Sequence, residues 1–233
     1  MLTLRKSEDR GPTRIGWLDS KHSFSFGGYR DPRHLGFRDL LVINEDRVTG
    51  GAGFGRHGHA NMEIISYVLE GALGHRDSIG TDGVIRPGEI QRMSAGTGIE
   101  HSEMNASATD PVHFLQIWIK PGAGKIAPGY EQVAMPPVTR PAQLDLIAGH
   151  EGGAGAVTLH ADARIYRASL RPGGSLDLSI PAGRHAWVQV ARGDAVVNGQ
   201  PLATGDGLAV SDEPTLSLSG GTAAAELLVF DLA

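Results

Sequence analysis

Short apolar runs separated by glycine-rich turns recur along most of the chain, and this rhythm constrains the fold more than any other feature. Such runs occupy residues 62–69, 90–93 and 112–119, and turns between them contain Gly71 and Gly88. The sequence has 33 glycines and 13 prolines, so turns are frequent and signals for long helices are weak. Many short strands at regular spacing predict an all-β barrel or sandwich.

A proline-rich stretch, residues 126–141, separates two halves that share this rhythm. In the second half, residues 186–193 resemble residues 65–71 of the first, which indicates a weak internal repeat. We therefore predict two similar barrels, with a first domain at residues 1–125, a linker between the halves, and a second domain at residues 142–233.

Composition excludes several kinds of protein. The chain has no cysteine, which excludes disulfides, cysteine–zinc sites and thiol catalysis, so any bound metal must be held by His, Asp or Glu. Its 21 basic and 26 acidic residues give a net charge of −5, which argues against a chain that coats nucleic acid. No run approaches the roughly 20 apolar residues of a membrane span. We expect a soluble, cytoplasmic monomer that binds neither nucleic acid nor membrane.

Four side chains form two alternating pairs in the first half: His57 with His59, and His101 with Glu103. Alternate residues of a β-strand project from the same face. If two strands of a barrel direct these pairs inward, three imidazoles and one carboxylate converge on one point. Such donors suit divalent iron, copper, nickel, zinc or manganese, so the two pairs together predict a metal site. A lone His-x-His pair would predict it much less strongly.

The second half lacks these ligands. Aligning the repeat places Ser179 and Pro181 at the positions of His57 and His59, and no histidine follows His185. We therefore expect the second barrel to keep the scaffold without a metal site.

Other candidate residues also have an ordinary structural interpretation. Residues 23–27, in which serine and phenylalanine alternate, predict a half-buried strand. Phe24, Phe26, Met93 and Trp118 could line a substrate pocket, although alternating apolar residues are more often core. The other histidines of the first half are interpreted as surface or hydrogen-bonded core residues; these are His22, His34, His75 and His113.

The spacing around the two pairs resembles the two cupin motifs: Gly51-x5-His57-x-His59-x3-Glu63, then Pro87-x-Glu89, then His101-x3-Asn105. Flanking segments are similar to those of the pirin family; they lie at residues 17–20, 24–26, 31–32, 36–37, 67–71, 94–98 and 101–103. The resemblance spans nearly the whole chain, includes a degenerate second cupin, and is strongest for bacterial pirins with quercetinase-type activity.

This resemblance implies an all-β bicupin, in which the N-terminal cupin-like β-barrel binds metal and the C-terminal barrel is degenerate. Carried over residue by residue, it makes His57, His59, His101 and Glu103 the ligands of one divalent transition metal. It leaves Glu63 out of the ligand set. Iron(II) is the expected ion, with copper, nickel, manganese and zinc as alternatives.

The activity that the resemblance implies is that of a quercetin 2,3-dioxygenase, which cleaves a flavonol or a similar enolic aromatic with O2. Glu103 is then the candidate catalytic residue that takes the enolic proton, and it could be a ligand, a base or both in turn. Two other hypotheses stay open, because one fold hosts many functions. One is a regulatory protein whose metal redox state controls binding to a transcription factor or metabolic enzyme. The other is a structural bicupin whose metal only stabilises the fold.

Overall fold

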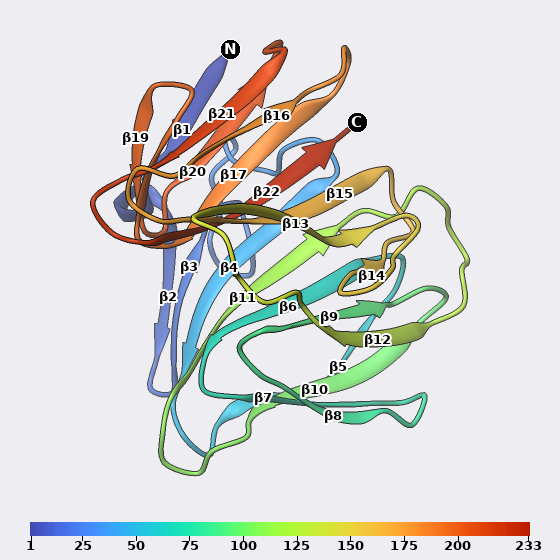
Figure 1. Cartoon of the computed structure of the whole chain (residues 1–233). Coiled ribbons are helices and arrows are strands. Elements are labelled where there is room, and N and C mark those ends of the chain that lie inside the picture. The colour runs from blue at the N-terminus through green and yellow to red at the C-terminus, as the bar shows by residue number, and fades with distance from the viewer.

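Nearly all of the regular structure is β-strand. The computed structural model describes residues 1–233 and contains 22 strands and one 3-10 turn (Figure 1). The elements of the first half are β1 (Leu2–Arg5), η1 (Ser7–Asp9), β2 (Gly11–Ile15), β3 (Leu18–His22), β4 (Leu40–Val48), β5 (Gly53–His59), β6 (Glu63–Glu70), β7 (Leu73–Asp77), β8 (Asp82–Ile85), β9 (Glu89–Ser94), β10 (Ile99–Asn105), β11 (Val112–Ile119) and β12 (Gly129–Ala134). The all-β prediction is confirmed, and no helix has the length and apolar character needed to cross a membrane.

The second half repeats the arrangement of the first. Its strands are β13 (Ala142–Gly149), β14 (Val157–Thr158), β15 (Ala163–Leu170), β16 (Ser175–Ser179), β17 (His185–Arg192), β18 (Asp194–Val197), β19 (Gln200–Ala203), β20 (Gly207–Ser211), β21 (Thr215–Gly220) and β22 (Ala225–Leu232). The first half consists of a seven-stranded sheet, β12-β9-β6-β11-β4-β3-β2, and a separate four-stranded sheet, β5-β10-β7-β8. The second half has the same plan, β1-β20-β17-β22-β15-β13-β14 with β16-β21-β18-β19. The prediction of two similar cupin-like barrels is confirmed.

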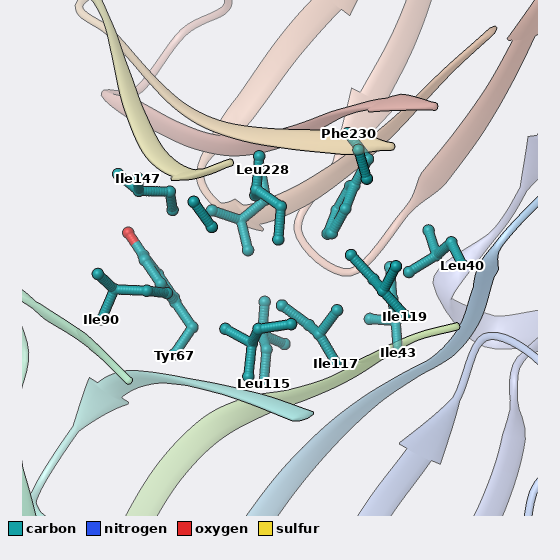
Figure 2. Close-up of a cluster of buried hydrophobic side chains, with 14 of the residues drawn as sticks. Leu40, Ile43, Tyr67, Ile90, Leu115, Ile117, Ile119, Ile147, Leu228 and Phe230 are labelled. Atoms are coloured by element: carbon teal, nitrogen blue, oxygen red, sulfur yellow. The ribbon is translucent and has the colours of Figure 1, made fainter. Parts of the chain in front are cut away.

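The largest apolar core lies between the two seven-stranded sheets. Figure 2 shows Leu228 and Phe230 of β22 facing Leu115 and Ile117 of β11 across this interface. On the other face of β11, Phe114 packs inside the first barrel. Because β6 and β11 are buried on both faces, they are nearly continuous apolar runs.

Two edge strands cross the predicted domain boundaries. β1 pairs with β20, so the first residues of the chain complete the sheet of the second half (Figure 1). β12 pairs with β9 and extends the sheet of the first half from within the predicted linker. The division at residues 125 and 142 stays a prediction, but the stretch at 126–141 contains a paired strand. Its prolines flank that strand, since proline cannot donate to a strand ladder; they are Pro128, Pro136, Pro137 and Pro141.

The predicted strand at residues 23–27 is wrong. β3 ends at His22, and a loop follows it. In this loop the Ser25 hydroxyl donates to the Asp31 carbonyl oxygen and accepts from the Asp31 N–H, both at 2.9 Å. These hydrogen bonds turn the chain back, so the segment cannot continue the ladder of β3.

Candidate metal centre

The four-stranded sheet of the first half carries the predicted ligands. β5 and β10 pair so that His57 lies opposite His101. Along β10, His101 and Glu103 are buried while the residues next to them are more exposed, as strand alternation predicts. A β-bulge between these two residues shifts the register, so Glu103 lies opposite Phe54.

Three imidazoles converge at this face. Ring centroids are 4.5 Å apart for His57 and His101, 4.7 Å for His57 and His59, and 5.0 Å for His59 and His101. One donor atom of each imidazole lies within 4.8 Å of the others. The structure thus brings three of the four predicted ligands around one point.

The hydrogen bonds of these imidazoles fit a bound cation. His57 Nδ1 lies 2.8 Å from the Gly55 carbonyl oxygen and donates to it, which leaves Nε2 free for a metal. Both ring nitrogens of His101 are buried and have no hydrogen-bond partner. Because buried polar atoms are nearly always paired, this orphaned imidazole is best explained as a metal ligand.

Burial keeps two of these imidazoles neutral. It is the main cause that lowers the pKa of His59 to about 4, and the neighbouring His101 and His57 act in the same direction. Burial also lowers the pKa of His101 to about 3, with His57 and His75 contributing. Since only the neutral imidazole binds a metal ion, both side chains are competent ligands at neutral pH.

Glu103 is buried, as His101 is, and its carboxylate is held by hydrogen bonds. Its Oε1 accepts a hydrogen bond from Ser66 Oγ at 3.1 Å, and its Oε2 accepts one from Gln116 Nε2 at 2.6 Å. These donors come from β6 and β11, which lie across the barrel from β10. The carboxylate does not join the three-imidazole cluster, but it lies within 4.8 Å of donor atoms of His101 and His75.

His75 lies beside this centre and is a buried, hydrogen-bonded histidine, as the sequence interpretation allowed. It lies on β7 directly opposite Glu103, is 2 % exposed, and has its ring centroid 5.3 Å from that of His101. Its Nε2 lies 3.1 Å from Asp77 Oδ2. In the sequence, only the alternation of His75 with Asp77 indicates that both side chains share one face of a strand. The pairing of β7 with β10 then brings that face to His101 and Glu103.

A second buried carboxyl group shares this interior. Asp46 on β4 is 3 % exposed, and burial is the main cause that raises its pKa to about 7. A hydrogen bond from Ser20 opposes this rise, while the charges of Glu103 and Glu45 add to it. The interior of the barrel therefore disfavours a further negative charge beside Glu103.

The four predicted pocket residues lie in two different places. Trp118 packs edge-on against His59, with ring centroids 4.9 Å apart, and Phe26 packs edge-on against Trp118 at 5.3 Å. Met93 is fully buried in a small apolar cluster that Trp118 covers. Phe24 lies in the core between the halves, with its ring centroid 4.9 Å from that of Trp187. Phe26 and Trp118 are thus beside the imidazoles, and the assignment of all four to a pocket stays a prediction.

The remaining histidines of the first half serve the structure. His22 Nδ1 lies 2.7 Å from Asn44 Oδ1, and His113 Nε2 lies 3.0 Å from Glu45 Oε1. His34 is partly exposed in a loop. Glu63 accepts a hydrogen bond at 3.2 Å from the backbone N–H of His160 in the second half, so it faces the domain interface.

Known proteins resemble this chain over its full length. A family model described as Pirin matches residues 4–119, and one described as Quercetinase C-terminal cupin domain matches residues 146–232. The quercetin 2,3-dioxygenase of Escherichia coli K12 is 43% identical over 232 residues, which cover 100% of this chain and 99% of the relative. A putative quercetin 2,3-dioxygenase of Mycobacterium tuberculosis is 41% identical, over 99% of this chain and 95% of the relative. The crystal structure of the bacterial pirin YhhW from Escherichia coli in complex with nickel(II) has a TM-score of 0.94 and 43% identity, and the match covers 100% of this chain and 99% of that one.

Proposed function

The chain belongs to the pirin family of bicupins, and on this basis we propose that it is a metal-dependent dioxygenase of the quercetin 2,3-dioxygenase type. Its substrate is a flavonol or a similar enolic aromatic, which it cleaves with O2. The observation that carries this proposal is the convergence of three imidazoles, with the buried His101 left without a hydrogen-bond partner.

We propose that His57, His59, His101 and Glu103 hold the metal. Three histidines and a carboxylate leave positions open on an ion that prefers five or six donors. The bound ion would supply Lewis-acid and redox chemistry to the enolic substrate and to O2. Iron(II) is our assignment for this chain, and the nickel(II) in the related YhhW structure supports a divalent ion of the first transition series.

Two aromatic side chains support a flat substrate. Trp118 lies against His59, and Phe26 lies against Trp118, so a ring that approaches the imidazoles would pass an aromatic surface. Aromatic pairs gain about 0.5–1.5 kcal/mol beyond the burial of their area. This surface would therefore orient the fused rings of a flavonol with an edge toward the metal centre.

Glu103 would take the proton from the enolic hydroxyl group. A general base must lie within hydrogen-bond reach of that proton, and the carboxylate now accepts from Ser66 and Gln116. Glu103 must therefore exchange at least one of these hydrogen bonds for a contact with the substrate.

Oxygen uptake by the metal-loaded protein tests the proposed activity. Quercetin should be consumed together with O2, whereas luteolin, which has the same rings without the enolic 3-hydroxyl group, should not. His57→Ala should abolish uptake, and His150→Ala, an exposed histidine outside the centre, should not. If the iron-loaded protein consumes no O2 with several flavonols, the regulatory hypothesis becomes the better account.

We also infer that the chain acts as a monomer. The large apolar face of each half is already covered by the other half, so this face is not available to a second copy. Light scattering should give the mass of one 24.6 kDa chain, and a dimer mass would contradict this inference.

A further inference from the structure

The buried side of the centre holds a second set of metal donors. His75, His101 and Glu103 each offer a donor atom, all within 4.8 Å of one another, and all three residues are buried. Only His101 belongs to both this set and the three-imidazole cluster. Two histidines with one carboxylate form a common ligand set for divalent iron and related ions, and such a set leaves positions open.

The surroundings of His75 are those of a metal ligand. Its Nε2 lies 3.1 Å from the Asp77 carboxylate, whereas its Nδ1 is buried and has no hydrogen-bond partner. Ligating histidines almost always donate their other ring N–H to a carboxylate or a carbonyl oxygen. Asp77 is itself fixed, because its Oδ1 accepts from the backbone N–H groups of Ile79 and Thr81 at 3.0 and 2.9 Å.

The pairing of strands places His101 between the two sets. On one side β10 pairs with β5, where His57 lies opposite His101. On the other side β10 pairs with β7, where His75 lies opposite Glu103 and Asp77 lies opposite His101. Both ring nitrogens of His101 lack a partner, so this imidazole can serve an ion on either side.

We propose that one metal ion has two alternative positions in this centre. The outer position is that of the proposed function, with His57, His59, His101 and Glu103. The inner position keeps His101 and Glu103 and replaces His57 and His59 with His75. Two dications at once are disfavoured, because they would lie close together with few carboxylates to balance their charge. The inference rests on the metal site of the proposed function, and it does not depend on the reaction.

Cobalt(II) binding to a variant without His57 and His59 tests the inner position. His57 and His59 are partly exposed, so the double variant H57A/H59A should fold, which thermal unfolding checks. Equilibrium dialysis should show one cobalt(II) bound per wild-type chain. The double variant should still bind one ion, with affinity lower by roughly 100-fold or more, since even indirect partners of a metal are worth 10–100-fold.

Adding His75→Phe to the double variant should abolish cobalt(II) binding, and adding His150→Ala instead should leave it unchanged. If the triple variant with His75→Phe is unstable, Asp77→Asn in the same background should weaken binding by about 10–100-fold. A folded H57A/H59A protein that binds no cobalt(II) at millimolar concentration would overturn the inner position. So would binding that does not change on loss of His75. Either result leaves wild-type binding and oxygen uptake, and so the proposed function, intact.

Discussion

Glu103 differs from the three histidines in its surroundings, and the difference suits a role as a base. It offers a donor atom within 4.8 Å of those of His101 and His75, and it accepts hydrogen bonds from Ser66 and Gln116. A carboxylate in this place can reach a substrate proton while the imidazoles hold the ion. The division predicts that metal binding and turnover respond differently to a change at this position.

If Glu103 acts chiefly as the base, Glu103→Gln should retain most of the bound metal and lose turnover. The amide keeps the shape of the side chain but cannot accept a proton, and general bases contribute about 10²–10⁴-fold to rate. Metal analysis and the kcat for quercetin, measured on the same preparation, check both parts. If this variant loses its metal as completely as His101→Ala does, Glu103 is chiefly a ligand and its assignment as the base is unsupported.

Asp46 makes the stability of the metal-free protein depend on pH. Its pKa is raised from an ordinary value of 3.8 to about 7 in the folded state, chiefly by burial. The folded protein therefore keeps this proton over an interval in which the unfolded chain releases it. The contribution of Asp46 to stability falls as the pH rises from about 4 to about 7.

Asp46→Asn should remove this loss, because an amide stays neutral. At about 1.4 kcal/mol per pKa unit, the variant should gain up to ~4 kcal/mol over wild type between pH 4.5 and pH 7.5. Urea unfolding of the metal-free proteins at these two pH values measures the gain. Asp19→Asn, a change at an exposed carboxyl group, is the control. An equal effect of Asp46→Asn at both pH values would contradict the assignment.

At the level of single residues, the sequence was sufficient for the outer imidazoles and insufficient for His75. His57, His59 and His101 stand out because strand alternation alone directs each pair to one face. His75 comes close to Glu103 only through the pairing of β7 with β10, and Glu103 lies opposite Phe54 only because of a β-bulge. No local sequence pattern predicts the register of β10 against β5 and β7, or the position of the bulge.

Among the elements, β6, β11 and β22 determine how the halves are joined. Their side chains alternate between the interior of a barrel and the interface, so both faces are apolar. In the sequence these strands are continuous apolar runs, which predict burial on both faces. The runs do not predict that the other half of the chain covers the second face. The pairing of β1 with β20 and of β12 with β9 likewise cannot be read from local sequence patterns, because an edge strand can pair with any free edge.

Phe230→Ala should destabilise the whole chain in a single step. Phe230 is 0 % exposed and lies in the interface core, and removal of a buried phenylalanine costs about 3–5 kcal/mol. Circular dichroism and metal release, followed in the same thermal scan, should shift together to lower temperature. Val196→Ala, at a residue that is 39% exposed on β18, should change little. Metal release that keeps its wild-type midpoint would show that the halves unfold independently.

For the molecule as a whole, one scaffold is used twice and one copy carries the chemistry. The strand orders of the two halves correspond, and Ser179 lies opposite Thr215 in the second half, where His57 lies opposite His101 in the first. Hydroxyl groups in place of imidazoles leave the second barrel without comparable donors. The second half therefore covers the apolar back of the metal-binding barrel, and the chain should bind one ion.

The most direct test of this account is oxygen uptake with quercetin as iron(II) is titrated into the metal-free protein. Uptake should rise in proportion to bound iron, reach a plateau at one ion per chain, and be absent from His101→Ala, which lacks the imidazole shared by both positions. No uptake from wild-type protein that carries one iron per chain, or equal uptake by His101→Ala, would contradict the account.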